Sequence, residues 1–191
     1  MANKASRTKL MLLVIDMLND FLDKWPSAQR KHLCDSTNHL VQMMRDANQL
    51  IVWIRQEFNS DLSDAFPEMR AKNIRITIRG TPGSEIVPEL KMVSSDVVIV
   101  KKRYSAFFGT TLDSLLDRIH PEALILAVIN THACIRTTEI DAYQRDRRVI
   151  LAADCIDSYD PQHHAISVQY MKDKIAEVMT NEDIRRNLLG D

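Results

Sequence analysis

Three strongly apolar segments of this chain lead into residues whose side chains could do chemistry together. These residues are Asp16, Lys101 and Cys134. Continuously apolar segments of this length are typical of parallel strands that are buried on both faces. Ligands of open parallel sheets bind outside the carboxyl ends of the strands, so we expect the carboxylate, the ammonium and the thiol to converge there. Their convergence would form a catalytic site with Cys134 as its nucleophile.

The residues after Cys134 predict that this cysteine begins a helix. Ile135, Ile140 and Tyr143 recur at roughly helical spacing after the apolar run 123–129. Backbone N–H groups and the helix dipole favour a thiolate at the start of a helix and would stabilise an oxyanion formed beside it. An isolated cysteine is otherwise often a small buried hydrophobe, an alternative that the expected acid and lysine disfavour.

The elements that must position these groups alternate between strand and helix. Strands are predicted near 10–15, 50–54, 96–100, 123–129 and 148–153, and helices near 29–48, 110–119, 134–146 and 161–175. This alternation predicts an α/β fold with a parallel sheet. Prolines, glycines and acidic residues interrupt this alternation over 55–95, which predicts a long loop. Long loops in compact domains are often functional. We therefore expect this segment to border the pocket, the alternative being a surface excursion.

Composition limits the class of protein. The 191 residues, 45% of them hydrophobic, fit one domain over 1–191. The 25 basic and 26 acidic residues nearly balance, so we expect a small-molecule substrate and neither nucleic acid nor a membrane as a partner. Residues 1–9 are polar, and no apolar stretch reaches the roughly 18–20 residues of a membrane span.

Cysteine and glycine usage point to a cytoplasmic protein without a cofactor. The three cysteines are odd in number and widely spaced, which favours a reducing compartment over a disulfide framework. Cys34 in a predicted helix and Cys155 after a predicted strand are interpreted as structural. The chain has four glycines and lacks a glycine-rich phosphate loop after a strand, so no cofactor is expected.

Three longer segments resemble, in order and spacing, the isochorismatase-like cysteine hydrolases, the superfamily of nicotinamidases, N-carbamoylsarcosine amidases and ureidoacrylate amidohydrolases. These segments are LLVIDMLNDF, VIVKKRYSAFFGTTLDSLL and INTHACIRTTEIDAYQRDRRVILAADCIDS. The similarity runs from about Leu10 to the chain end. It implies a three-layer α/β/α, Rossmann-like fold with a six-stranded, mostly parallel sheet and helices on both faces, the sixth strand falling near 177–180.

The same resemblance assigns the triad to Asp16, Lys101 and Cys134. Lys101 would lower the pKa of Cys134, while Asp16 would accept the thiol proton and return it to a leaving amine. The backbone N–H groups of Asn130 and Cys134 would form the oxyanion hole, with a cis peptide bond between Ile129 and Asn130.

The chain departs from the family pattern at two positions beside this site. Val128 stands where the family usually has glycine, and we expect its added bulk to alter the pocket or reduce activity. Glu139 stands where the family usually has alanine, and we expect it to affect packing or an interface rather than chemistry.

The residues after the second predicted strand bear on the substrate. Nicotinamidase-like members carry an Asp-x-His metal motif there, whereas this chain reads Arg55-Gln56-Glu57-Phe58-Asn59, which disfavours a metal site and a nicotinamidase. The segment Arg55-Gln56-Glu57 and Tyr104 resemble instead the polar pocket of members that act on ureido or carbamoyl acids. We expect Gln56 to bind the carbamoyl group, Tyr104 to reach its carbonyl or a carboxylate, and Phe21 to supply an apolar wall.

Several histidines lie close in sequence to these motifs. His132 stands beside Cys134, and His163 and His164 begin a predicted helix. Adjacent histidines point in different directions on a helix, so we expect solvated or capping roles rather than metal ligation.

Together these residues predict a cysteine-dependent amidohydrolase. It would cleave the C–N bond of a small ureido or carbamoyl acid, or of a primary amide, through a covalent thio-acyl intermediate and release ammonia. The alternatives are a vinyl-ether hydrolase of the isochorismatase type, which uses the acid rather than the thiol, and a non-catalytic oligomeric binding or redox-sensing protein. Family members usually assemble as dimers or tetramers, so a homo-oligomer is expected.

Overall fold

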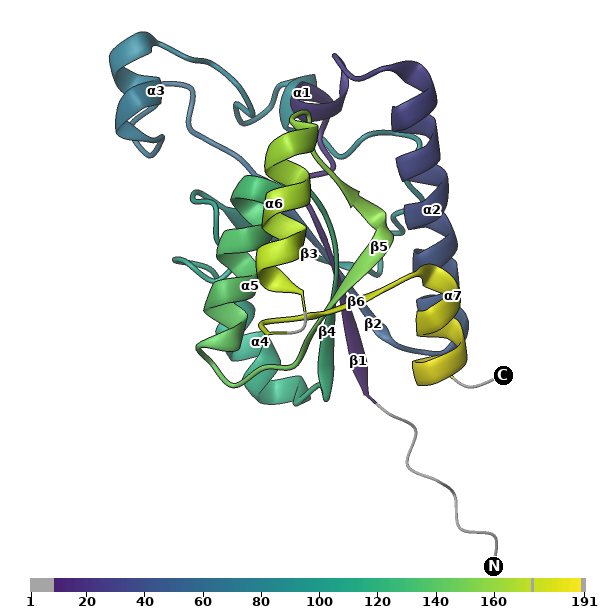
Figure 1. The fold of residues 1–191 in the computed structure, drawn as a ribbon. Helices are drawn as coiled ribbons and strands as arrows, with labels where there is room; N and C mark the ends of the chain where they lie inside the picture. Colours follow the sequence, from purple (N-terminus) through teal and green to yellow (C-terminus); the bar gives the residue numbers. More distant parts are fainter. Residues whose placement is uncertain (1–8, 173, 190–191) are drawn as a thin grey trace, which may run out of the picture.

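A six-stranded parallel sheet forms the centre of the computed structural model, which describes residues 9–172 and 174–189. The expectations for 1–8, 173 and 190–191 lie outside these residues. The strand order is β3-β2-β1-β4-β5-β6 (Figure 1). The strands are β1 Leu10–Ile15, β2 Leu50–Gln56, β3 Val97–Lys101, β4 Ala123–Ile129, β5 Val149–Asp157 and β6 Glu177–Met179.

Helices cover both faces of this sheet (Figure 1). They are α1 Asn19–Leu22, α2 Ser27–Asp46, α3 Pro67–Lys72, α4 Leu112–Ile119, α5 Arg136–Tyr143, α6 Pro161–Met171 and α7 Asn181–Ile184. A 3-10 turn spans Pro82–Ser84, and π-helical turns span Thr131–Ile135 and Arg185–Leu189. Within the part of the chain that the structure describes, no helix has the length and apolarity that a membrane span requires. The predicted three-layer α/β/α fold with helices on both faces is confirmed.

Two apolar cores fill the space between the sheet and its helices. All residues of β1 and β4 are buried, as their continuously apolar sequences predict. The even-numbered residues of β1 belong to the core shared with α2 and α7, and the odd-numbered residues to the core shared with α4, α5 and α6. This alternation follows from the two-residue period of a strand and fixes which way each strand end points.

Some element boundaries differ from the prediction in ways that matter for the site. The second strand extends to Gln56 and the third includes Lys101, so both residues end strands rather than follow them. Strand β5 runs to Asp157, which places Cys155 inside the strand rather than after it. Periodicity locates the centre of a strand, but its end depends on pairing with neighbours far away in sequence.

The segment between β2 and β3 forms a small structure with its own apolar core. This core contains Phe58, Leu62, Ala65, Met69 and Ile78, with Phe66 and Ile74 packed against it. Figure 1 shows α3, which belongs to this segment, standing out beside the end of the sheet where α1 lies. The segment is therefore a folded insertion at the carboxyl ends of the strands, where the predicted pocket lies.

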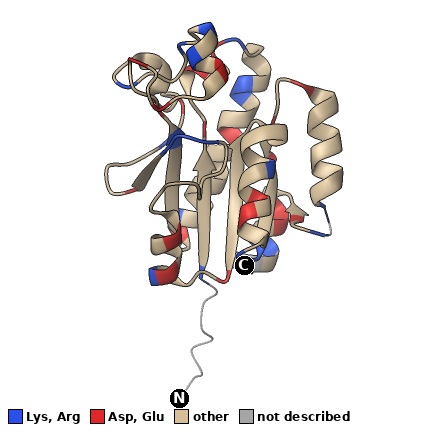
Figure 2. Ribbon diagram, turned by 90° about the vertical axis from the view of Figure 1, so that its left-hand side faces the viewer, with Lys and Arg blue, Asp and Glu red and all other residues tan. Residues whose placement is uncertain are grey.

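Charged residues of both signs are interspersed over the helices and loops in view in Figure 2. One acidic residue, Asp96, is instead largely buried. The Asp96 side chain, which is 9% exposed, accepts three hydrogen bonds on Oδ2, from Trp53 Nε1 at 2.8 Å, Arg45 Nη2 at 3.0 Å and the Val93 N–H at 3.1 Å. Trp53 is fully buried in β2, so Asp96 attaches the beginning of β3 to β2 and α2.

We expect Asp96→Ala to lower the free energy of unfolding by about 2–3 kcal/mol, because it leaves the buried Trp53 indole N–H without an acceptor and removes the contacts of Arg45 and Val93 with Asp96. Urea unfolding measures this change. Asp46→Ala is the matched control, because exposed Asp46 accepts from Gln42 at the end of α2 and its loss should change stability by less than about 0.5 kcal/mol. Equal stability of the two variants would contradict the anchoring role of Asp96.

Candidate active site

The three predicted reactive residues lie at the carboxyl end of the sheet. Asp16 directly follows β1, Lys101 is the last residue of β3, and Cys134 lies in the turn that follows β4. Strands β1 and β4 are neighbours, and the chain leads from β1 to β2 on one side and from β4 to β5 on the other. A crevice opens at such a reversal of strand order, which is where ligands of open α/β sheets bind.

Lys101 joins the other two residues. Its Nζ lies 2.7 Å from Asp16 Oδ2 and 3.5 Å from Cys134 Sγ. The ammonium also donates to the carbonyl oxygens of Arg103 at 3.0 Å and Tyr104 at 3.2 Å. Asp16 and Lys101 are fully buried, and Cys134 is 5% exposed. The structure therefore brings the acid, the amine and the thiol together in a site shielded from water.

Sheet pairing explains how side chains from different strands meet. Lys101 pairs in register with Gln56 on β2, the strand between β3 and β1. Asp16 Oδ1 accepts a hydrogen bond from the Gln56 N–H at 3.0 Å, and the Asp16 N–H donates to Ile54 at 2.8 Å. The Asp16 backbone has φ 58°, a left-handed conformation that costs about 1 kcal/mol in a residue with a Cβ. These contacts turn the carboxylate toward the long Lys101 side chain, which reaches across β2.

Burial and charge set the protonation of this group. Burial alone would lower the pKa of Lys101, but the adjacent Asp16 carboxylate opposes it, so the pKa is raised and the ammonium persists. Burial raises the pKa of Cys134 far above its ordinary value, and the Asp16 charge adds to this effect. Lys101 lowers the pKa of Cys134, as expected, but by less than burial and Asp16 together raise it. The free site therefore holds a neutral thiol beside an ion pair, not the resting thiolate that the sequence suggested.

The turn that presents Cys134 differs from the predicted helix start. The predicted cis peptide bond between Ile129 and Asn130 is confirmed. Thr131–Ile135 then form a π-helical turn in which Ala133 and Ile135 donate to the Asn130 carbonyl, at 3.1 and 3.4 Å, and α5 begins only at Arg136. Cys134 thus lies one residue before the last of this turn rather than at the first turn of an α-helix.

A cavity of about 510 Å³ lies over Cys134. It is lined by Phe21, Gln56, Phe66, Pro67, Glu68, Met69, Ile74, Ile76, Tyr104, Asn130, His132, Ala133, Cys134 and Tyr159. Phe21, Gln56 and Tyr104, the predicted substrate-binding residues, all line it, as does Asn130. The residues from 66 to 76 had no individual signal in the sequence, because only folding of the insertion determines which of its apolar side chains face the cavity.

The residues on either side of Gln56, Arg55 and Glu57, do not line the cavity. Arg55 pairs with Glu57 at 3.0 Å and Glu85 at 3.1 Å, and Glu57 pairs with Arg79 at 2.8 Å. Of the expected polar segment, only Gln56 lines the cavity. Its Nε2 is buried without a hydrogen-bond partner among the described residues, so a donor is available to a ligand.

The histidines near the site contact protein groups. His163 Nδ1 lies 3.1 Å from Asp160 Oδ2, and His164 Nδ1 lies 2.8 Å from Thr131 Oγ1. Over residues 9–172 and 174–189, no group of three or more His, Cys, Asp or Glu side chains is arranged to hold a metal ion.

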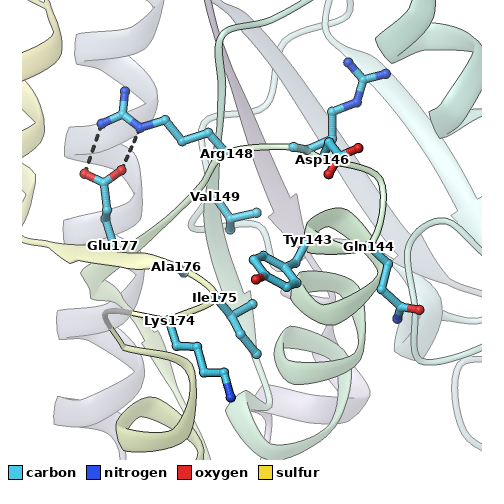
Figure 3. Close-up of a pocket in the computed structure, with 10 residues that line it drawn as sticks. Tyr143, Gln144, Asp146, Arg148, Val149, Lys174, Ile175, Ala176 and Glu177 are labelled. Carbon is cyan, nitrogen blue, oxygen red and sulfur yellow. Dashed lines mark hydrogen bonds and ion pairs between the residues drawn. The ribbon is translucent and has the colours of Figure 1, made fainter.

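A second cavity, of about 610 Å³, lies beside the beginnings of β5 and β6 (Figure 3). Figure 3 shows the ion pair of Arg148 and Glu177 beside it, with 2.6 Å between Nε and Oε1. Its lining contains none of the three reactive residues, so we place the candidate site in the cavity over Cys134.

Both departures from the family pattern are buried. Val128 is fully buried in β4 within the core that includes α4, α5 and α6. Glu139 is fully buried on α5, and neither carboxyl oxygen has a hydrogen-bond partner within the described part of the chain. Burial raises the pKa of Glu139 to about 8. The predicted apolar stripe was wrong here, because α5 buries Glu139 with Thr138 and Ala142 while Tyr143 is 49% exposed.

Comparisons with known proteins agree with this architecture. The family model of the isochorismatase domain matches residues 10–183. A protein of Arabidopsis thaliana named as a probable inactive nicotinamidase is 32% identical over 170 residues, which cover 84% of this chain and 87% of that protein. The crystal structure of an isochorismatase family protein from Desulfovibrio vulgaris is 28% identical, has a TM-score of 0.83, and covers 93% of this chain and 96% of its own. N-carbamoylsarcosine amidase from Thermoplasma acidophilum is 25% identical, with a TM-score of 0.78 and coverage of 93% and 99%.

We expect Cys134 to be alkylated slowly by iodoacetamide at pH 7, because its thiol is protonated. Asp16→Asn removes a charge that raises the pKa of Cys134, so the reaction should begin at lower pH, whereas Lys101→Met should move it to higher pH. Mass spectrometry of protein labelled across a pH series measures both shifts, with Cys134→Ala as the blank for the other two cysteines. Shifts of the same sign in both variants would show that these charges do not control the thiol.

We expect Glu139→Gln to stabilise the protein at pH 8 and to have little effect at pH 5. The folded-state pKa of about 8 exceeds that of an exposed glutamate, so ionisation of the unfolded chain reduces stability as pH rises from the unfolded to the folded value. Urea unfolding should show a gain of roughly 2–4 kcal/mol at pH 8. Exposed Glu68→Gln is the control and should show no such dependence on pH; a Glu139→Gln gain that is equal at both pH values would rule out a protonated Glu139.

Proposed function

This chain belongs to the isochorismatase family and is one of its hydrolases, and we propose that it is a cysteine-dependent amidohydrolase. It would cleave the C–N bond of a small amide or carbamoyl group through a thio-acyl intermediate on Cys134 and release ammonia. The observation that carries the proposal is the contact of Lys101 Nζ with both Asp16 Oδ2, at 2.7 Å, and Cys134 Sγ, at 3.5 Å, beneath a cavity.

The first half of the reaction transfers the acyl group to sulfur. Asp16, whose Oδ2 lies 2.7 Å from the same Lys101 Nζ that contacts Cys134 Sγ, accepts the thiol proton as Sγ attacks the carbonyl carbon. The Lys101 ammonium stabilises the sulfur anion while it forms. Backbone N–H groups of Asn130 and Cys134 would bind the carbonyl oxygen as it becomes negative. Asp16 then gives its proton to the amide nitrogen, the C–N bond breaks, and ammonia leaves the thio-acyl enzyme.

The second half restores the enzyme. A water molecule attacks the thio-acyl carbon and gives a proton to Asp16, the C–S bond breaks, and the proton returns to Cys134. The raised pKa of Cys134 fits this sequence, because the thiolate forms only when substrate is in place to accept the sulfur. Deprotonation and attack are thereby linked in one step.

Three residues of the cavity would hold the substrate. Gln56 offers a buried Nε2 donor to a carbonyl oxygen, Tyr104 offers its hydroxyl, and Phe21 packs against the apolar part. A buried donor that has no partner in the protein costs free energy, which a substrate oxygen would recover on binding.

A non-catalytic binding protein is the second candidate. The relative from Arabidopsis thaliana is named as a probable inactive nicotinamidase, and the neutral resting thiol of Cys134 suits a protein that binds without reaction.

Ammonia release from a panel of primary amides, ureido compounds and nicotinamide separates the two candidates. We expect turnover of at least one class and a loss of about 10³-fold or more in Cys134→Ala, because removal of a nucleophile abolishes the covalent route. Cys34→Ala, which removes a buried thiol of α2, should retain activity. Acid-quenched wild-type protein should carry the acyl group on Cys134 by mass spectrometry. Absence of both turnover and adduct would favour the binding protein.

A further inference from the structure

We infer that the cavity over Cys134 selects uncharged amides and rejects amides that carry a carboxylate, and that His132 sets this preference. The inference rests on the proposed amidohydrolase activity and narrows its substrate class. It differs from the sequence-based expectation of a ureido or carbamoyl acid.

The lining of the cavity lacks a cation that could pair with a carboxylate. Among the described residues that line it there is no lysine or arginine, and Glu68 is the single acid. Glu68 pairs with Lys72 at 2.8 Å in an exposed ion pair. At the floor, the charges of Lys101 and Asp16 cancel each other. A substrate carboxylate would lose its hydration here without gaining a partner, which is unfavourable.

Basic residues near the cavity are already engaged with other groups. Arg103 Nη1 donates to the carbonyl oxygens of Asp64 at 2.9 Å and Lys102 at 2.6 Å, and its guanidinium lies 5.1 Å from the ring centre of Phe66. Lys102 Nζ pairs with Asp64 Oδ2 at 3.0 Å. These contacts hold both cations away from the lining.

His132 is the side chain of the lining that could supply a positive charge, and its contacts keep it neutral. Its Nδ1 lies 2.8 Å from Ser158 Oγ, which also accepts from the Asp160 N–H at 3.3 Å. The His132 and His163 ring centres lie 5.5 Å apart, so a second imidazole stands beside His132. Burial lowers the pKa of His132, nearby His163 lowers it further, and Asp160 opposes both. The His132 ring also meets the Tyr159 ring edge to face, with 5.1 Å between their centres.

Aromatic residues define what the cavity accepts instead. The Phe66 and Tyr104 ring centres lie 4.8 Å apart and come from the insertion and the segment after β3, while His132 from the turn after β4 packs with Tyr159 from the segment after β5. Aromatic surfaces favour apolar or planar groups, and Gln56 Nε2, which has no hydrogen-bond partner among the described residues, supplies a neutral donor. An uncharged primary amide or urea with an apolar substituent fits this set of groups.

Matched pairs of compounds test the preference. Benzamide is compared with 4-carbamoylbenzoate, hexanamide with adipamate, and propylurea with N-carbamoyl-β-alanine. We expect kcat/KM for ammonia release at pH 7.5 to favour the neutral member of each pair that reacts by about tenfold or more, because an unpaired carboxylate is costly to bury. Equal values, or a preference for the acids, would overturn the inference.

Substitutions of His132 test its role. His132→Lys places a permanent cation in the lining, and we expect the ratio of acid to neutral kcat/KM to rise about tenfold, as for one partly buried charge pair. His132→Gln keeps a neutral donor and should leave the ratio unchanged. His39→Lys adds the same charge at an exposed position on α2 and serves as the control. Because each ratio is taken within one variant, an effect on Cys134 reactivity cancels; an unchanged ratio in His132→Lys would exclude His132 as the determinant.

Binding to Cys134→Ala separates this inference from the proposed function. Dissociation constants of the same pairs are measured by titration calorimetry. Tighter binding of the neutral members, without turnover by the wild type, would retain the selectivity and overturn the amidohydrolase alone. Turnover with a preference for the acids would support the amidohydrolase activity and overturn the inferred selectivity. Failure of every compound to bind would overturn the inference about the cavity.

Discussion

The structure of the site depends on the fully buried ion pair between Lys101 and Asp16. Two charges removed from water each cost several kcal/mol unless contacts within the protein replace hydration. Here the 2.7 Å contact, two backbone carbonyls and the Gln56 N–H provide that replacement. These partners come from β2, the end of β3 and the segment after it, so the ion pair forms only when the three strands β1, β2 and β3 are in register. Correct pairing of these strands is therefore a condition for the chemistry of the site.

The ion pair also explains two properties of the cavity above it. Its charges sum to zero, so the floor does not attract a charged substrate. Asp16 and Lys101 act in opposite directions on the pKa of Cys134, and burial decides the balance in favour of the thiol. A buried nucleophile that stays protonated until an acyl carbon is present suits a site in which Asp16 carries the proton between sulfur, leaving group and water. Burial likewise raises the pKa of Glu139, whose carboxyl oxygens have no hydrogen-bond partner among the described residues.

Reactivity and selectivity come from different parts of the chain. Asp16 and Cys134 follow the central strands β1 and β4, all of whose residues are buried, and Lys101 ends the edge strand β3. The selective surface lies on the insertion between β2 and β3, which has an apolar core separate from the two cores of the sheet, and on the turn after β4, where His132 contacts Ser158. Changes in the insertion can thus alter which molecules enter without disturbing the ion pair. This separation is what loops on a rigid α/β scaffold allow.

From the amino-acid sequence one could predict the parallel sheet, the placement of Asp16, Lys101 and Cys134 near strand ends and, through resemblance, the cis peptide bond before Asn130. These follow from local signals, since continuous apolar runs specify buried strands and a motif keeps its order and spacing. The folded structure was needed to establish that Cys134 rests as a thiol, that Arg55 and Glu57 lie outside the cavity lining, and that Glu139 is buried. Each of these depends on burial and on charges brought close by residues far apart in sequence, and both the free energy of desolvation and the Coulomb interaction are set by distances that only the folded chain defines.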